Sequence, residues 1–169
     1  MTYKEITYDL FRYIEEHKEN GGIAVAHCIS RDLAMGAGIA KKFTEYGIKS
    51  TLQYFVEHQG SLDGVDSIWT VGNKYNTPLY NVIVHNLITK EHYWEKPTYE
   101  SITKSIMSMR DSIIKANNYY AGYNNALVVK TLTMPKIGCG LDRLNWETVS
   151  NIIKQEFKDT DIDIIVCLQ

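Results

Sequence analysis

Residues 134–146 read Met-Pro-Lys-Ile-Gly-Cys-Gly-Leu-Asp-Arg-Leu-Asn-Trp and connect two apolar segments. The segment before them, residues 126–132, predicts a strand, and the segment after them repeats apolar residues at helical spacing. Glycines let backbone N–H groups approach a ligand, and a helix N-terminus adds partial positive charge. A loop in this setting therefore suits a phosphate or diphosphate group.

A second loop of this kind spans residues 30–38 and reads Ser-Arg-Asp-Leu-Ala-Met-Gly-Ala-Gly. A predicted strand at residues 23–28 precedes it, and a predicted helix from about Ile39 follows it. One Gly-x-Gly pair is weak evidence, because a tight turn with close helix packing explains it equally well. Two such units in one small domain favour a shared ligand site.

The remaining segments alternate between strand and helix patterns. Strands are predicted at residues 3–9, 67–71, 79–88 and 162–168, and helices at residues 10–19, near residues 52–56, and after the cap residues Thr98 and Asn145. Residues 117–125 are polar and tyrosine-rich and predict a surface loop. The alternation predicts an α/β fold with three α/β/α layers. Its central sheet should be mixed, because the strands in residues 67–88 are joined too briefly for a helical crossover.

In open α/β sheets ligands bind beyond the carboxyl ends of the strands, so the two glycine loops and the strand end at Lys90 would converge on one cleft if their strands run parallel. Two ionisable residues there, Lys90 and Asp142, are candidates for the chemistry. Lys90 follows the strand pattern of residues 79–88, and a lysine there is usually solvated. If Lys90 instead faces the cleft, desolvation and two helix N-termini would favour a neutral amine that acts as a nucleophile or base. Asp142 would then accept a proton, although a carboxylate before a helix can also serve as a cap.

Three other residues each have two readings. Cys139 lies at a helix start, which can favour a thiolate. No partner histidine is assignable to it, and a small residue in a tight loop is the simpler explanation. Tyr93 and Trp94 follow Lys90 and could stack on a base or ribose, or could cover the edge of the sheet.

Composition limits the class of protein. The 169 residues suit one domain spanning 1–169, and 44% hydrophobic with 22% charged residues is typical of a soluble globular protein. A net charge of -2 argues against binding nucleic acid mainly by phosphate neutralisation. Three cysteines without a C-x-x-C pair, and histidines without paired ligand spacing, predict neither a disulfide framework nor a metal site. Without a signal-like or membrane-length apolar run, we expect a cytoplasmic monomer that needs no cofactor.

Six segments, in order over nearly the whole chain, resemble macrodomains, in the branch of the terminal ADP-ribose protein glycohydrolase, also called O-acyl-ADP-ribose deacylase. They are residues 9–11 (Asp-Leu-Phe), 26–30 (Ala-His-Cys-Ile-Ser), 35–40 (Met-Gly-Ala-Gly-Ile-Ala), 87–90 (Leu-Ile-Thr-Lys), 96–100 (Lys-Pro-Thr-Tyr-Glu) and 134–144. The resemblance implies an α/β/α macrodomain that binds ADP-ribose. Asp9 would accept the adenine amino group, and the two glycine loops would wrap the diphosphate and distal ribose.

The resemblance also implies roles for individual residues. Lys90 would attack the anomeric carbon of the distal ribose, and Asp142 would assist and resolve the lysyl adduct. The ADP-ribose-binding residues would be Asp9, Leu10, Ser30, Met35, Gly36, Ala37, Gly38, Ile39, Thr89, Ile137, Gly138, Cys139, Gly140 and Leu141. Other macrodomains use a catalytic asparagine in the first loop, and this chain has His27-Cys28-Ile29-Ser30 there.

The predicted function is an ADP-ribosyl hydrolase that acts on ester-type adducts, either ADP-ribosylated acidic side chains or O-acyl-ADP-ribose. Three alternatives stay open. One is an ADP-ribose 1''-phosphate phosphatase. Another is a DNA ADP-ribosyl hydrolase, since Glu91-His92-Tyr93-Trp94 resembles the His-Trp segment of antitoxin macrodomains that remove ADP-ribose from DNA. The third is a reader that binds ADP-ribose without turnover, which the presence of both Lys90 and Asp142 disfavours.

Overall fold

Six strands form one sheet in the computed structural model, which describes residues 1–168. They are β1 (Tyr3–Ile6), β2 (Ile23–Ser30), β3 (Ser67–Val71), β4 (Ile83–Lys90), β5 (Thr131–Met134) and β6 (Asp163–Cys167). Their order across the sheet is β1-β6-β5-β2-β4-β3, and every neighbouring pair is parallel except β3 and β4. The predicted mixed sheet is confirmed.

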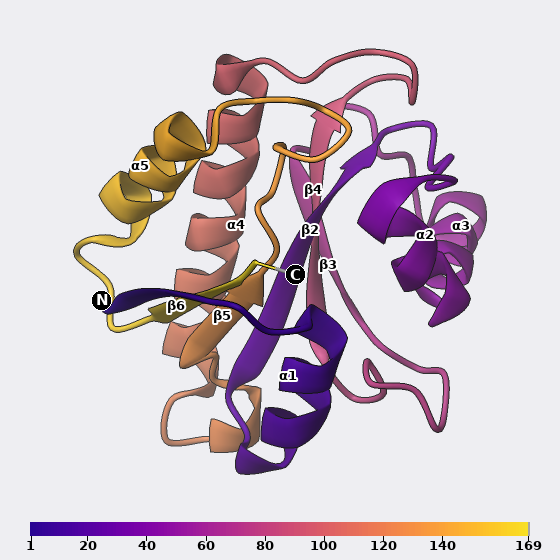
Figure 1. Ribbon diagram of the computed structural model, residues 1–169. Coiled ribbons are helices and arrows are strands. Elements are labelled where there is room, and N and C mark those ends of the chain that lie inside the picture. The colour runs from indigo at the N-terminus through magenta and orange to yellow at the C-terminus, as the bar shows by residue number, and fades with distance from the viewer. Residues whose placement is uncertain (169) are drawn as a thin grey trace.

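The described residues 1–168 form five α-helices, and these helices cover the two faces of the sheet (Figure 1). One face carries α1 (Leu10–His17), α2 (Gly38–Glu45) and α3 (Ile48–His58), and the other carries α4 (Tyr99–Tyr120) and α5 (Trp146–Phe157). Each layer encloses its own apolar core against the sheet. The strands β2 and β4 lie between these cores and are buried along most of their length, as parallel strands covered on both faces are. The three-layer α/β/α prediction is confirmed.

Polar side chains begin three of these helices by accepting backbone hydrogen bonds. Asp9 accepts from the N–H of Arg12 at the start of α1. Thr98 and Ser101 form a reciprocal capping box on α4, and Asn145 accepts from the N–H of Thr148 on α5. The predicted caps Thr98 and Asn145 are confirmed. Within residues 1–168, no helix combines the length and apolar character that a membrane span requires.

The predicted bounds of the strand at residues 126–132 are wrong. Its first residues form a 3-10 turn, η2 (Asn125–Leu127), and β5 begins only at Thr131. The cause is Asn117 on α4, whose amide nitrogen donates to the carbonyl of Val129 at 2.9 Å and whose amide oxygen accepts from the Val129 N–H at 2.8 Å. A side chain thus satisfies backbone groups that a neighbouring strand would otherwise pair.

Three further boundaries differ from the predictions. The surface loop predicted at residues 117–125 is partly wrong, because α4 continues to Tyr120. The strand predicted from residue 79 begins at Ile83, since Val82 N–H closes a turn onto the carbonyl of Leu79. The first strand ends at Ile6 rather than residue 9, where Asp9 already caps α1.

Candidate active site

Three neighbouring parallel strands, β5, β2 and β4, have their carboxyl ends side by side. Because β2 pairs in parallel with both β4 and β5, the carboxyl ends of all three strands lie at the same end of the sheet. A pocket of about 980 Å³ opens at these carboxyl ends. Its volume is at the upper end of the usual range for small-molecule sites. Both glycine loops line the pocket, together with Lys90 and residues 93–96. The predicted meeting of the two loops and the β4 end in one cleft is confirmed.

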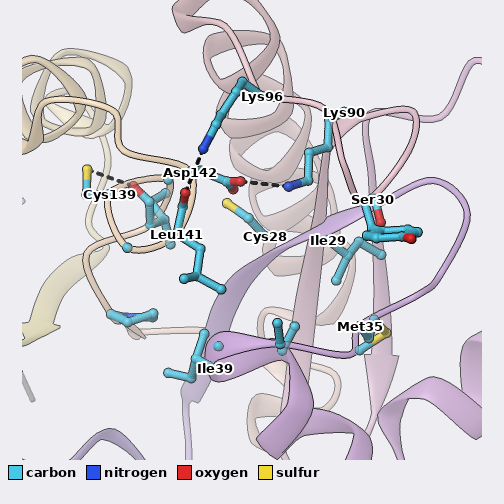
Figure 2. A pocket seen from close by; sticks show the side chains of 18 of the residues that line it. Cys28, Ile29, Ser30, Met35, Ile39, Lys90, Lys96, Cys139, Leu141 and Asp142 are labelled. Atoms are coloured by element: carbon cyan, nitrogen blue, oxygen red, sulfur yellow. Dashed lines mark hydrogen bonds and ion pairs between the residues drawn. The ribbon is translucent and has the colours of Figure 1, made fainter.

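Lys90 and Asp142 point toward each other in this pocket (Figure 2). The Nζ atom of Lys90 donates to Oδ1 of Asp142 at 2.6 Å, and the two side chains are only 15% and 18% exposed. Lys90 is therefore not the solvated strand end that its sequence position alone favours. The pair places an amine beside a carboxylate that can accept its proton, which nucleophilic catalysis by lysine requires.

The loop after β5 is held in a tight conformation around Gly138. This glycine has a φ of +73°, and a Cβ there would lie 2.7 Å from Cδ1 of Ile102 on α4. The N–H of Leu144 donates to the Gly138 carbonyl at 2.8 Å, which closes the loop. The Nζ of Lys96 donates to the carbonyl of Leu141 at 2.9 Å (Figure 2). These contacts fix the backbone that carries Asp142.

The loop after β2 leads directly into α2. Ala37 is the N-cap of α2 and has no polar side-chain atom, so the side chain cannot satisfy the N–H groups of the first turn. Gly38 opens the helix, and a Cβ there would lie 3.3 Å from Cδ1 of Leu141. The two glycine loops thus approach each other at the pocket. Free N–H groups at a helix N-terminus form a binding site for an anion such as a phosphate.

Three cysteines line the pocket, Cys28, Cys139 and Cys167, and burial raises the pKa of each thiol. Burial, reinforced by the negative charge of Asp142, raises the pKa of Cys28 to about 12. Burial is also the main reason that the pKa of Cys139 is raised to about 11. A thiolate is the reactive form of cysteine, so these values disfavour Cys28 and Cys139 as the nucleophile. They support the reading of Cys139 as a small residue in a tight loop.

The buried histidines belong to the core rather than to the pocket. His27 on β2 stacks on Phe43, and its Nε2 lies 2.6 Å from Oδ1 of Asn86. Burial lowers the pKa of His27 and of His85 to about 4, although the contact with Asn86 partly opposes the shift of His27. Across residues 1–168, no cluster of three or more His, Cys, Asp and Glu side chains is suited to a metal ion.

Most of the predicted ligand-binding residues line the pocket: Ser30, Met35, Gly36, Ala37, Gly38, Ile39, Ile137, Gly138, Cys139, Gly140 and Leu141. Asp9, Leu10 and Thr89 lie outside this lining. The carboxylate of Asp9 caps α1, and the side chain of Leu10 is fully buried in the core. Thr89 is buried beside Lys90 on β4, and its hydroxyl has no hydrogen-bond partner within the described part of the chain.

Some pocket residues were missed by sequence reasoning. Cys167 and Leu168 line the pocket at the end of β6. Because β6 pairs in parallel with β5 and ligands bind beyond the carboxyl ends of such strands, both residues could have been predicted from their place at the end of the last strand. Lys96 also lines the pocket, but its contact with the Leu141 carbonyl depends on how two loops meet, and its sequence context carries no signal of that.

Comparisons with known proteins place this architecture in a family. No protein-family model matches the chain. The human and bovine ADP-ribose glycohydrolases OARD1 are each 37% identical over 145 residues, which cover 85% of this chain and 80% of those proteins. Among solved structures, the macrodomain of Mycobacterium tuberculosis DarG matches with a TM-score of 0.73 at 16% identity, over 99% of this chain and 98% of that one.

A second solved structure, Thermosipho africanus DarTG in complex with ADP-ribose, matches 100% of this chain and 42% of that chain, with a TM-score of 0.73 at 13% identity. At these identities the structural matches show the fold. The sequence match to OARD1 is closer and spans most of both proteins. The chain therefore belongs to the macrodomain family, in the group that includes the ADP-ribose glycohydrolase OARD1.

Proposed function

We propose that this macrodomain is an ADP-ribosyl hydrolase that removes ADP-ribose from ester-type adducts, including ADP-ribosylated acidic side chains and O-acyl-ADP-ribose. The observation that carries the proposal is the contact between Lys90 and Asp142 inside a pocket flanked by two glycine loops. The relative of this chain that is named an ADP-ribose glycohydrolase gives independent support.

The pocket offers a place for each part of the ligand. The uncapped start of α2, preceded by Gly36 and Ala37, suits the diphosphate. The distal ribose would then lie between the Gly138–Leu141 loop and the end of β4, with its anomeric carbon near Lys90. Asp9 is exposed at the start of α1, and in this proposal it accepts the adenine amino group.

For an adduct whose ester oxygen is bound to the anomeric carbon, the reaction needs two displacements at that carbon. Lys90 loses a proton to Asp142 and its Nζ forms a bond to that carbon, while the bond to the ester oxygen breaks and the acid leaves as a carboxylate. Water then adds to the lysyl adduct with Asp142 assisting proton transfer, and the C–N bond breaks to restore the amine. The net change is hydrolysis of one ester to an acid and ADP-ribose.

A specific observation favours a second substrate class, ADP-ribosylated DNA bases. Tyr93 and Trp94 line the pocket and are 63% and 66% exposed, so their rings can stack on a planar group attached to the ribose. Both readings use the same Lys90 and Asp142 chemistry and differ only in the group that leaves. Neither involves the phosphate ester of ADP-ribose 1''-phosphate, which would be a third substrate for the pocket.

One panel of substrates and one trapping reaction test the proposal. Purified protein is assayed against ester-linked ADP-ribosylated protein, O-acetyl-ADP-ribose, thymidine-linked ADP-ribosylated DNA and ADP-ribose 1''-phosphate. Reductive trapping with cyanoborohydride and ADP-ribose should give a covalent adduct on Lys90, which the Lys90→Ala variant lacks. Unchanged turnover in Lys90→Ala would refute the nucleophile role. ADP-ribose binding without hydrolysis of any substrate would instead identify a reader.

A further inference from the structure

Asp32 lies just beyond β2 and joins two walls of the pocket. Its Oδ1 accepts hydrogen bonds from the hydroxyl of Ser30 at 2.5 Å and from the N–H of Ala34 at 3.0 Å, both within the first glycine loop. Its Oδ2 accepts from the N–H of Tyr93 at 2.9 Å, in the segment that follows Lys90. The segment of residues 91–96, called the post-β4 segment below, is thus attached to the first glycine loop.

The post-β4 segment is attached at its other end to the second glycine loop. There the Nζ of Lys96 donates to the carbonyl of Leu141, the residue before Asp142. Lys90 lies immediately before this segment, and its amine contacts Asp142. One continuous set of contacts therefore runs from the first glycine loop through Asp32 to the segment that positions Lys90, and on to the loop that positions Asp142.

The contacts of Asp32 have the character of charge-assisted hydrogen bonds. Burial by itself raises the pKa of Asp32, but the hydrogen bonds from Ser30, Ala34 and Tyr93 outweigh it and lower the pKa below its usual value. Such bonds to an ionised acceptor are stronger than neutral ones. The residues on either side of Ala34, Leu33 and Met35, have φ values of 58° and 48°, which non-glycine residues rarely adopt. Asp32 holds the loop in this conformation.

We infer that Asp32 is a positioning residue, which fixes the post-β4 segment against the first glycine loop and thereby keeps the Lys90 amine at Asp142. Asp32 itself lies outside the pocket lining, so it acts through Tyr93 and Ala34 rather than on the substrate. The inference rests on the proposed function, because it assigns Asp32 a role in presenting the Lys90 nucleophile.

The test compares Asp32→Asn with wild type and with the control Asp63→Asn, which makes the same change at an exposed side chain that takes part in none of these contacts. An Asn side chain has one acceptor oxygen, so it cannot serve the donors on both walls at once. In Asp32→Asn, turnover and the rate of cyanoborohydride trapping at Lys90 should fall about 10- to 100-fold, as expected for lost charge-assisted bonds. The affinity for ADP-ribose should change by a much smaller factor, and Asp63→Asn should match wild type.

A second readout follows the hydrogen bond itself and does not depend on activity. Hydrogen exchange of the Tyr93 amide should be about tenfold faster in Asp32→Asn than in Asp63→Asn. Lys96→Met removes the hydrogen bond between the post-β4 segment and the second glycine loop and should also slow trapping, so it carries the test if Asp32→Asn does not fold. Both variants are compared at a temperature where thermal melting shows them folded.

The outcomes separate the inference from the proposed function. Wild-type protein that forms no Lys90 adduct would refute the nucleophile role, and with it the task assigned to Asp32. Normal trapping in wild type, with equal rates in Asp32→Asn and Lys96→Met, would overturn the positioning role alone. A fall in rate matched by an equal fall in ADP-ribose affinity would also overturn it, because Asp32 would then serve only ligand binding.

Discussion

The Nζ atom of Lys90 lies 2.6 Å from Oδ1 of Asp142, although the two residues are 52 positions apart in the chain. Lys90 is the last residue of β4, and Asp142 lies in the loop between β5 and α5. The contact exists because β2 lies between β4 and β5 and pairs with both in parallel. The sheet thus delivers an amine and a carboxylate to one pocket from two distant segments.

Asp142→Asn should separate catalysis from binding. The amide keeps the size of the side chain but cannot take the proton of the Lys90 amine, so turnover should fall about 100-fold or more, as for loss of a general base. ADP-ribose affinity measured by calorimetry should stay within about threefold. The matched control is Asp161→Asn, which makes the same change at an exposed residue between α5 and β6 and should keep full turnover. Normal turnover in Asp142→Asn would remove Asp142 from the mechanism.

Gly138→Ala should destabilise the protein more than the same change at Gly122. Both glycines have positive φ, at 73° and 72°, so both substitutions cost about 1 kcal/mol of backbone strain. A Cβ at Gly122 meets no atom within 4 Å, whereas one at Gly138 lies 2.7 Å from Cδ1 of the buried Ile102. Urea unfolding should show an additional loss of about 1 to 3 kcal/mol in Gly138→Ala. Equal losses of unfolding free energy in the two variants would mean that Ile102 on α4 moves aside without destabilising the protein.

Acid should weaken the fold between about pH 6.5 and pH 4 through the buried histidines. Burial lowers the pKa of His85 to about 4, below its ordinary value near 6.5, so only the unfolded chain binds a proton in this window. The free energy of unfolding should therefore fall as the pH falls, by up to about 2 kcal/mol for this histidine at pH 5.

The variant His85→Leu tests this pH dependence. It removes ring nitrogens that have no hydrogen-bond partner among the described residues, so stability at pH 7 should be kept or slightly raised. The loss of stability between pH 7 and pH 5, measured by urea unfolding, should be smaller than in wild type. The exposed His58→Gln serves as the control and should keep the wild-type dependence. If the free energy of unfolding of His85→Leu depends on pH as strongly as that of wild type, His85 is not a source of the acid sensitivity.

Asn117→Ala should destabilise the chain just before β5. Its amide makes both hydrogen bonds to the backbone of Val129, and truncation leaves those groups unpaired at a loss of about 1 to 3 kcal/mol. The neighbouring change Asn118→Ala alters the same helix without touching Val129 and should cost well under about 1 kcal/mol. Hydrogen exchange at the Val129 amide should accelerate only in Asn117→Ala. Equal exchange in both variants would show that solvent replaces the bonds freely.

Local sequence patterns account for most of the elements and for the position of the site. The apolar residues of β2 and β4, the helical spacing after Asn145, and the two glycine loops each depend on residues close together in the chain. Because parallel strands bring their carboxyl ends together, both loops and the β4 end were expected to meet at one pocket, and they do. The limits of β5 could not be obtained in this way, because the backbone before it is paired by Asn117 from α4.

Sequence alone determined that Lys90 stands at the end of a strand and that Asp142 stands in a glycine loop, and the family resemblance supplied their roles. The sequence left open whether the lysine faces solvent or the pocket, and its position by itself favoured solvent. Tertiary structure decided this, because the direction of a strand-end side chain depends on what neighbouring segments bring to it. The same holds for Asp32, whose contact with Tyr93 arises only when two loops that are distant in the chain fold against each other.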